Sequence, residues 1–248
     1  QHRFEGQNLQ QLKKGTSSAE SVTISFYVKG NAAATYTIEL YDYDNTRTFS
    51  QRFNVTTSWN RVSLTYAGDT SGAFDDDNAL SLILLMWLHA GSNYTSGTQN
   101  SGWAAYDATT RANSSDTSFF DSTNRTFEIT GLQLEIGEVA TPFEHRSFGE
   151  ELALCQRYYQ ASSETTGNLL FFSGHVDSGA TYFAKEKLTV PMRAAPTVTV
   201  GSEVGKDGFA GAPSVSWQTT QSIRSSNTAN ANSNQGYYFF QYTASAEL

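Results

Sequence analysis

The feature of this sequence that most constrains its fold is a period of two in the placement of its apolar residues. Every second residue is apolar over 22–28, and the pattern returns over 36–40 and 59–66. Successive side chains of a β-strand point to opposite faces, so this period predicts strands with one face in a core. With no regular helical period between these strands, we expect an all-β chain containing a two-sheet antiparallel sandwich.

The longest apolar run, residues 79–88, predicts a strand that is buried on both faces. It is too short to cross a bilayer, so we expect no membrane insertion. Residues 90–123 are rich in Ser, Thr, Asn and Gly, which predicts a long connection with one short strand near Trp103. The alternation changes face at Thr130 and Gly131, which indicates a β-bulge.

Composition and charge narrow the classes of partner. Charged residues make up 16% of the chain and aromatic residues 13%, a mixture that suits half-solvated strands. The net charge of −8 argues against nucleic acid, because binding to phosphates needs a basic face. An anionic membrane surface is disfavoured for the same reason. The single cysteine, Cys155, excludes an intrachain disulfide, so packing or association between copies must hold the fold.

The chain changes character after Thr141-Pro142. Ser147 and Glu150 have the spacing of a capping box, and apolar residues at helical spacing predict a helix over about 147–159. Sequence patterns typical of short strands return after this helix. We therefore expect a sandwich over 1–141, a linking helix over 142–160 and a β-rich domain over 161–248. The last part would bury little surface alone, so it should depend on the first domain or on partner subunits.

Aromatic side chains with neighbouring Asn, Asp and Gln groups suit the flat apolar faces of sugar rings. The candidates for glycan binding are Trp103, Tyr94 and Tyr106 in the long connection. The aromatic segment 237–242 is a further candidate, although its alternation equally suits a core or a subunit contact. Trp59 and Trp87 lie in alternating or apolar strands, so we expect them in the core.

Signals for catalysis are weak in this sequence. The four histidines stand in no recognisable spacing for a nucleophile or a metal. Glu150 and Glu151 are adjacent, and adjacent residues of a helix point about 100° apart, so they do not face one substrate as a glycosidase pair would. Helix capping accounts for Glu150 better. We therefore expect a protein that is not an enzyme.

Several segments together resemble one protein family. They are residues 4–9, 11–16, 68–75, 129–137 and 141–159, the last of which contains Glu151-Leu-Ala-Leu-Cys-Gln-Arg-Tyr-Tyr159. This combination is similar to the tail-fibre and appendage proteins of marine bacteriophages. In that family a jelly-roll domain like those of carbohydrate-binding modules leads into such a helix and a variable β tip. The resemblance spans about residues 1–200, and the helix motif is its most specific part.

The resemblance implies a jelly-roll first domain in a virion protein that works outside the cell. It implies a homo-oligomer, commonly a trimer, that assembles with other virion proteins, and an attachment region preceding this sequence. Trimers would raise the avidity for a host-surface glycan even where each site is weak. Head fibre, tail fibre and baseplate appendage all stay open, and no catalytic residue carries over.

The resemblance also implies one structural calcium ion. Many jelly-roll carbohydrate-binding modules hold Ca²⁺ between a glutamate near the first strand and an acidic residue near the last. Glu5 and Glu135 occupy those positions here. Two further acidic clusters, Asp42 with Asp44 and residues 75–77, offer oxygen ligands, with solvated turns as the alternative.

Two other functions compete with a phage appendage. One is a carbohydrate-binding module detached from a secreted polysaccharide-active enzyme. The other is a fibre-borne depolymerase, which would need two carboxylates facing a groove.

Overall fold

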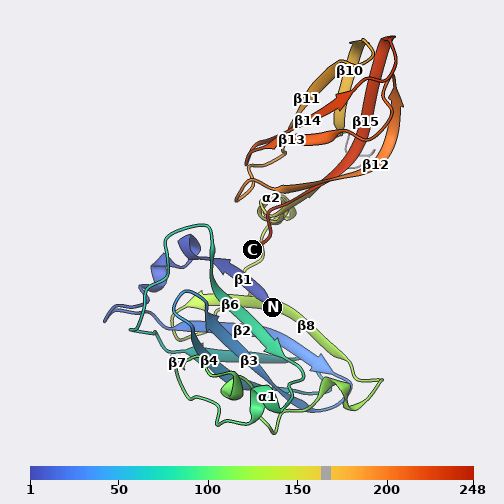
Figure 1. The fold of residues 1–248 in the computed structure, drawn as a ribbon. Helices are drawn as coiled ribbons and strands as arrows, with labels where there is room; N and C mark the ends of the chain where they lie inside the picture. Colours follow the sequence, from blue (N-terminus) through green and yellow to red (C-terminus); the bar gives the residue numbers. More distant parts are fainter. Residues whose placement is uncertain (163–168) are drawn as a thin grey trace. The chain divides into compact units, whose positions relative to one another are not determined.

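The computed structural model describes residues 1–162 and 169–248. They form two compact units. The first consists of Gln1–His145 together with the last residue, Leu248, and the second consists of Arg146–Glu247. Strands dominate both units, which confirms the all-β prediction (Figure 1). Of the helices in the described residues, none is long and apolar enough to span a membrane.

The first unit is a jelly-roll sandwich of two antiparallel sheets, as predicted. One sheet has the strand order β1-β6-β3-β4-β7 and the other β5-β2-β8. The strands are β1 (His2–Glu5), β2 (Val22–Gly30), β3 (Ala34–Asp42), β4 (Arg47–Val55), β5 (Asn60–Tyr66), β6 (Leu80–Trp87), β7 (Ala104–Ala105) and β8 (Phe127–Ile136). Short helical segments lie in the connections: η1 (Gly6–Asn8), η2 (Gln10–Leu12), α1 (Ser92–Thr95), η3 (Ala108–Thr110) and η4 (Phe119–Asp121).

The core of the first unit lies between these sheets and is built from alternate residues. Phe26 of β2 and Ile38 of β3 are completely buried in it. On β6, Leu82 and Leu84 belong to the core cluster, and Ile83 on the opposite side of the strand is buried as well. The predicted burial of this strand on both faces is therefore confirmed for residues 82–84.

The predicted bulge in β8 is also confirmed. Ser25 of β2 pairs with Gln133 and Tyr27 pairs with Thr130, so two residues of β8 lie opposite one residue of β2. Gly131 takes up the turn of the backbone with φ of 61°, a left-handed conformation that glycine adopts without strain.

The expectation that Trp59 lies in the core is wrong. Val62 and Tyr66 of β5 face the core, and Trp59 stands in the opposite phase of the alternation, which points it outward. Trp59 is 47% exposed, and its ring centre lies 5.1 Å from the Lys29 ammonium. Trp87 also lies outside the core cluster, half-buried at the end of β6.

The second unit begins with α2 (Phe148–Gln156), whose capping box is present as predicted. The Ser147 hydroxyl accepts from the Glu150 N–H at 3.3 Å, and the Glu150 carboxylate accepts from the Ser147 N–H at 3.0 Å. The helix ends before the predicted residue 159, because Tyr159 begins strand β9 and pairs with Ser245.

The strands of the second unit form two further antiparallel sheets. The orders are β10-β15-β12, with β9 paired to β15, and β11-β14-β13. The strands are β9 (Tyr159–Ala161), β10 (Leu170–Val176), β11 (Thr181–Lys187), β12 (Thr197–Asp207), β13 (Ser214–Gln218), β14 (Ser222–Thr228) and β15 (Ser233–Ser245). Tyr238, Phe240 and Tyr242 of β15 are buried in a core of this unit, so one face of segment 237–242 is core.

We expect Gly131→Ala to lower the free energy of unfolding of the first unit by about 1–2 kcal/mol, because an L-residue is strained at this positive φ. The matched control is Gly91→Ala, since Gly91 has φ of −86° and no atom within 4 Å of an added Cβ. The control should change stability by less than about 0.5 kcal/mol. Urea titration of tryptophan fluorescence measures both. Equal stability of the two variants would contradict the assignment of the bulge.

Candidate functional site

The outer face of the larger sheet, away from the core, carries a polar row. On β3, Thr37, Glu39 and Tyr41 alternate with the core residues and point to this face. The long connection over residues 91–117 packs on it. The Thr37 hydroxyl donates to Asp116 at 2.6 Å, and the Ser50 hydroxyl donates to the Arg111 carbonyl at 2.9 Å. The connection is therefore attached to the sheet by hydrogen bonds.

A buried ion pair lies at the centre of this face. Glu39 is fully buried, and Arg111 Nε donates to its two carboxylate oxygens at 3.0 and 3.2 Å. The Trp87 indole N–H donates to the same carboxylate at 2.7 Å. Burial raises the pKa of Glu39, and the contacts with Arg111 and Trp87 offset only part of that rise. The carboxylate thus orients Arg111 and Trp87 together.

Aromatic rings surround the Arg111 guanidinium. Its central carbon lies 5.0 Å from the Trp87 ring centre, 5.1 Å from that of Tyr106 and 5.4 Å from that of Tyr41. Tyr94 packs on Trp87 at 5.1 Å, and Tyr43 packs on Tyr41 at 6.1 Å. We call the five residues that carry these rings the aromatic patch: Tyr41, Tyr43, Trp87, Tyr94 and Tyr106. Arginine over aromatic faces is a favourable contact that fixes the position of the rings.

The aromatic patch is open to solvent at its rim. Tyr43 is 53% exposed, and Tyr94 and Tyr106 are each 37% exposed. Asp107, next to Tyr106, caps η3 by accepting the Thr109 N–H at 2.8 Å. The hydrogen bonds from Thr109 lower the pKa of Asp107, so this carboxylate, one position along the chain from Tyr106, stays charged. The patch combines flat apolar faces with a polar acceptor, the chemistry expected of a sugar site.

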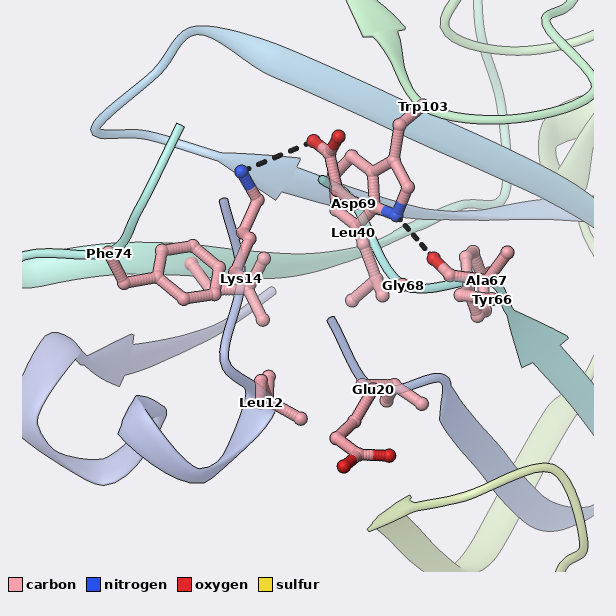
Figure 2. Close-up of a pocket in the computed structure, with 12 residues that line it drawn as sticks. Leu12, Lys14, Glu20, Leu40, Tyr66, Ala67, Gly68, Asp69, Phe74 and Trp103 are labelled. Carbon is pink, nitrogen blue, oxygen red and sulfur yellow. Dashed lines mark hydrogen bonds and ion pairs between the residues drawn. The ribbon is translucent and has the colours of Figure 1, made fainter. Parts of the chain in front are cut away.

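The structure brings Tyr94 and Tyr106 to one patch but places Trp103 elsewhere. Trp103 packs against the core, with its ring centre 6.0 Å from that of Phe49. Its indole N–H donates to the Ala67 carbonyl at 2.8 Å, as Figure 2 shows. Trp103 thus lies at the end of the sandwich core.

The pocket beside Trp103 is small. Its lining includes Leu12, Lys14, Leu40, Tyr66 and Phe74 (Figure 2). It leaves about 20 Å³ of space, which holds about one water molecule. A sugar ring does not fit this pocket without rearrangement of its walls.

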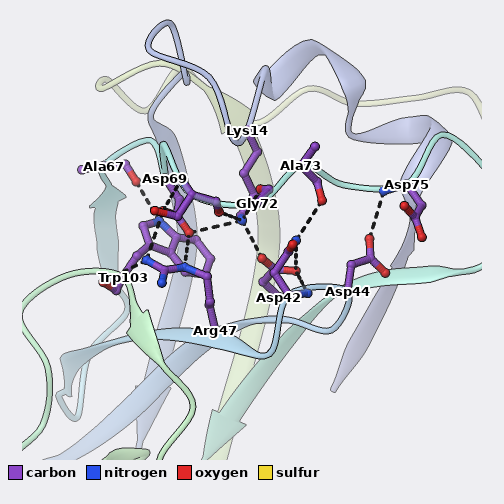
Figure 3. A network of polar contacts seen from close by, with 12 residues as sticks. Lys14, Asp42, Asp44, Arg47, Ala67, Asp69, Gly72, Ala73, Asp75 and Trp103 are labelled. Atoms are coloured by element: carbon purple, nitrogen blue, oxygen red, sulfur yellow. Dashed lines mark hydrogen bonds and ion pairs between the residues drawn. The ribbon is translucent and has the colours of Figure 1, made fainter.

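Lys14 closes this end of the core with a buried polar network (Figure 3). Its ammonium lies 2.5 Å from Asp42 and 3.2 Å from Asp69, and it donates to the Ser71 and Gly72 carbonyls at 2.8 Å. Asp42 is fully buried, so it is not a solvated turn residue. Burial raises the pKa of Asp69, but the contacts with Arg47, the Ser71 N–H and Lys14 outweigh it and lower the pKa overall.

The two residues proposed for calcium lie in different sheets. Glu5 ends β1, is fully buried and accepts from the Gln7 amide at 2.5 Å. Glu135 lies on β8 and accepts from the hydroxyl and N–H of Thr141, which lower its pKa. Within the described residues, no three His, Cys, Asp or Glu side chains gather into a metal site. The calcium site therefore stays a prediction.

Sequence reasoning missed Glu39, Tyr41 and Arg111. One signal was present, since Glu39 occupies an outward position in the middle of a strongly alternating strand. A carboxylate there needs a partner if a loop covers it. Nothing in the local sequence identifies Arg111 as that partner.

We expect Arg111→Met to destabilise the first unit by about 3–5 kcal/mol, because Glu39 would stay buried without its cation. Without Arg111 the pKa of Glu39 should rise further, so the folded state would take up a proton there. The loss of stability should therefore be smaller near about pH 5 than near about pH 8. Urea denaturation at both pH values measures this. A loss that does not depend on pH, or one below about 1 kcal/mol, would contradict the role of the pair.

This chain shows only limited similarity to known proteins. No protein-family model matches the chain, and no curated protein matches it. Among solved structures, recombinant discoidin II of Dictyostelium discoideum is 12% identical, with a TM-score of 0.24, over 92% of this chain and 74% of that one. Wild-type discoidin II of the same organism is 11% identical, with a TM-score of 0.26, over 94% and 75%.

Proposed function

We propose that this chain is a glycan-binding module and that the aromatic patch is its binding surface. The observation that carries the proposal is the set of half-exposed rings fixed around Arg111 by the buried Glu39. Rings that are already in place lose little conformational entropy when a ligand binds. Tyr94 and Tyr106 present apolar faces, and the phenol hydroxyls and Asp107 offer hydrogen bonds to sugar hydroxyls.

The chemistry of the patch favours binding over catalysis. Glu39, the carboxylate beneath the rings, is fully buried and is held by Arg111 and Trp87. A general acid or base must reach the proton that it transfers, and Glu39 does not reach a ligand on the surface.

We place this module in an extracellular appendage of a bacteriophage, in contact with other virion proteins. The support is the sequence resemblance, whose most specific part, Glu151–Tyr159, covers most of α2 and the start of β9. Attachment to host-surface glycans is the role that such a position gives to a sugar-binding patch.

The same resemblance supports a homotrimer, and α2 is the segment that we assign to the contact. No residue of α2 is buried in the described structure, and Phe148 is 82% exposed. Leu152 and Leu154 are 42% and 46% exposed. A short helix is marginal in water unless an apolar face packs against something, and neighbouring copies of α2 would supply that packing.

We expect Tyr106→Ala to weaken glycan binding by about 1–2 kcal/mol, roughly five- to thirty-fold, because it removes a ring of the patch. A glycan array of neutral and acidic oligosaccharides identifies ligands for the intact chain, and calorimetry of the best ligand compares variants. Tyr27→Ala is the matched control, since Tyr27 is 39% exposed and lies near Arg61 on the other sheet. If no glycan on the array binds, or if both variants lose the same amount of affinity, the proposal is overturned.

For the oligomer, sedimentation should give a mass about three times the 27.2 kDa of one chain. Phe148→Asp should convert the trimer to monomer, since an acidic residue is favourable at a helix N-terminus but disrupts an apolar contact. The control is Val139→Asp, at a residue that is 76% exposed in the first unit. A monomeric wild-type chain would rule out this part of the proposal.

A further inference from the structure

The outer face of the β11-β14-β13 sheet gathers cations and aromatic rings. Phe183, Lys185 and Lys187 of β11 are exposed and alternate with Tyr182 and Ala184, which pack on the core. Arg224 projects from β14 and Trp217 from β13. We call Phe183, Lys185, Lys187, Trp217 and Arg224 the basic face.

Among the residues that the structure describes, the cations of the basic face have no acidic partners. Lys185 pairs directly with Arg224 in the register of the two strands. Like charges opposite each other destabilise a sheet. Within the described part of the chain, no carboxylate lies at ion-pair distance from Lys185, Lys187 or Arg224. Glu186, the acidic residue of β11, stands in the opposite phase of the strand, toward the core. Local charge repulsion is therefore built into a chain whose net charge is −8.

The rings and the guanidinium of this face are arranged as a surface. The Arg224 guanidinium lies 5.1 Å from the Phe183 ring centre, and its Nε donates to the Ser216 hydroxyl at 3.1 Å. Phe183 is 55% exposed and Trp217, which pairs with Arg224 across the strands, is 49% exposed. Arg224 is thus held in place by an aromatic ring and a hydroxyl, while no carboxylate in the described part of the chain neutralises its charge.

We propose that the basic face binds an acidic polysaccharide, a sugar chain that carries carboxylate or sulfate groups. The cations pair with the acidic groups, and Phe183 and Trp217 pack on the ring faces between them. The face extends about 10 Å across three strands and about 13 Å from Phe183 to Lys187, which suits a short stretch of a sugar chain. Like charges placed side by side lower stability, and proteins keep such arrangements mainly at functional sites.

A sparsely charged sugar chain fits better than a nucleic acid. A protein that tracks a nucleic acid backbone usually makes six or more phosphate contacts, about twice what three cations provide. The overall net charge of −8 also repels a polymer with a phosphate at every unit more strongly than it repels a polysaccharide.

This site is separate from the aromatic patch of the first unit and goes beyond the function proposed for it. The test uses the intact chain and biolayer interferometry with two sparsely charged probes: immobilised hyaluronan, which carries a carboxylate on every second sugar, and immobilised κ-carrageenan, which carries a sulfate on every second sugar. Neutral dextran and a single-stranded oligothymidine serve as comparison probes. The variant is Lys185→Gln with Arg224→Gln. The matched control is Lys206→Gln, in the same unit, whose ammonium is already paired with Glu203.

We expect hyaluronan, κ-carrageenan or both to bind, dextran not to bind, and the double variant to weaken binding about tenfold or more. The control should bind as the wild type does. The double variant should melt at the same temperature as the wild type or higher, because it relieves repulsion, so that lost binding is not mistaken for unfolding. No binding to either acidic probe, equal binding of dextran, tighter binding of oligothymidine, or an unaffected double variant would overturn the proposal.

Discussion

The architecture of the candidate site depends on the ion pair between Glu39 and Arg111. A carboxylate at an outward position of a central strand would ordinarily be hydrated, but here the connection over 91–117 covers it. Covering Glu39 without a cation would leave a buried charge unpaired, which is costly. The connection therefore packs in an arrangement that places Arg111 beside Glu39. That arrangement sets the rings of Trp87 and Tyr106 on two sides of the guanidinium. The pair thus specifies a conformation more than it adds to stability, and the exposed patch is the result.

Two groups of cations carry the features described above, and they differ in what they face. Lys14 and Arg111 are buried with carboxylates, the first closing the end of the sandwich core and the second organising the patch. Lys185 and Arg224 face solvent and each other, and no carboxylate of residues 1–162 or 169–248 pairs with them. Charges of the first kind are compensated inside the fold, and removing a partner affects folding. Charges of the second kind are compensated by ions or by a ligand. The basic face is therefore a candidate surface for binding an anionic ligand.

Local patterns in the sequence predict the elements well and the site poorly. Alternation predicts which residues of 22–28 face the core, the change of phase at Gly131 predicts the bulge, and Ser147 with Glu150 predicts the helix start. Each of these signals acts over a few residues. The site depends on partners that are far apart in sequence, since Glu39 and Arg111 are 72 positions apart, and no local period connects them. The tryptophans show the same limit. Trp103 lies in a polar connection yet packs on the core, and Trp87 ends an apolar strand yet belongs to the aromatic patch.

The indole N–H signals of three of the four tryptophans test the account most directly, because each reports on a different place. Trp87 donates to Glu39 beneath the patch, Trp103 donates to Ala67 at the core end, and Trp59 is exposed on the other sheet. The isotopically labelled chain would be titrated with the neutral oligosaccharide that binds best on the array and followed by NMR. Our account predicts that the Trp87 signal shifts with saturation while those of Trp103 and Trp59 stay in place. A shift of Trp103 or Trp59 with an unmoved Trp87 would show that the sugar binds elsewhere and would contradict the account.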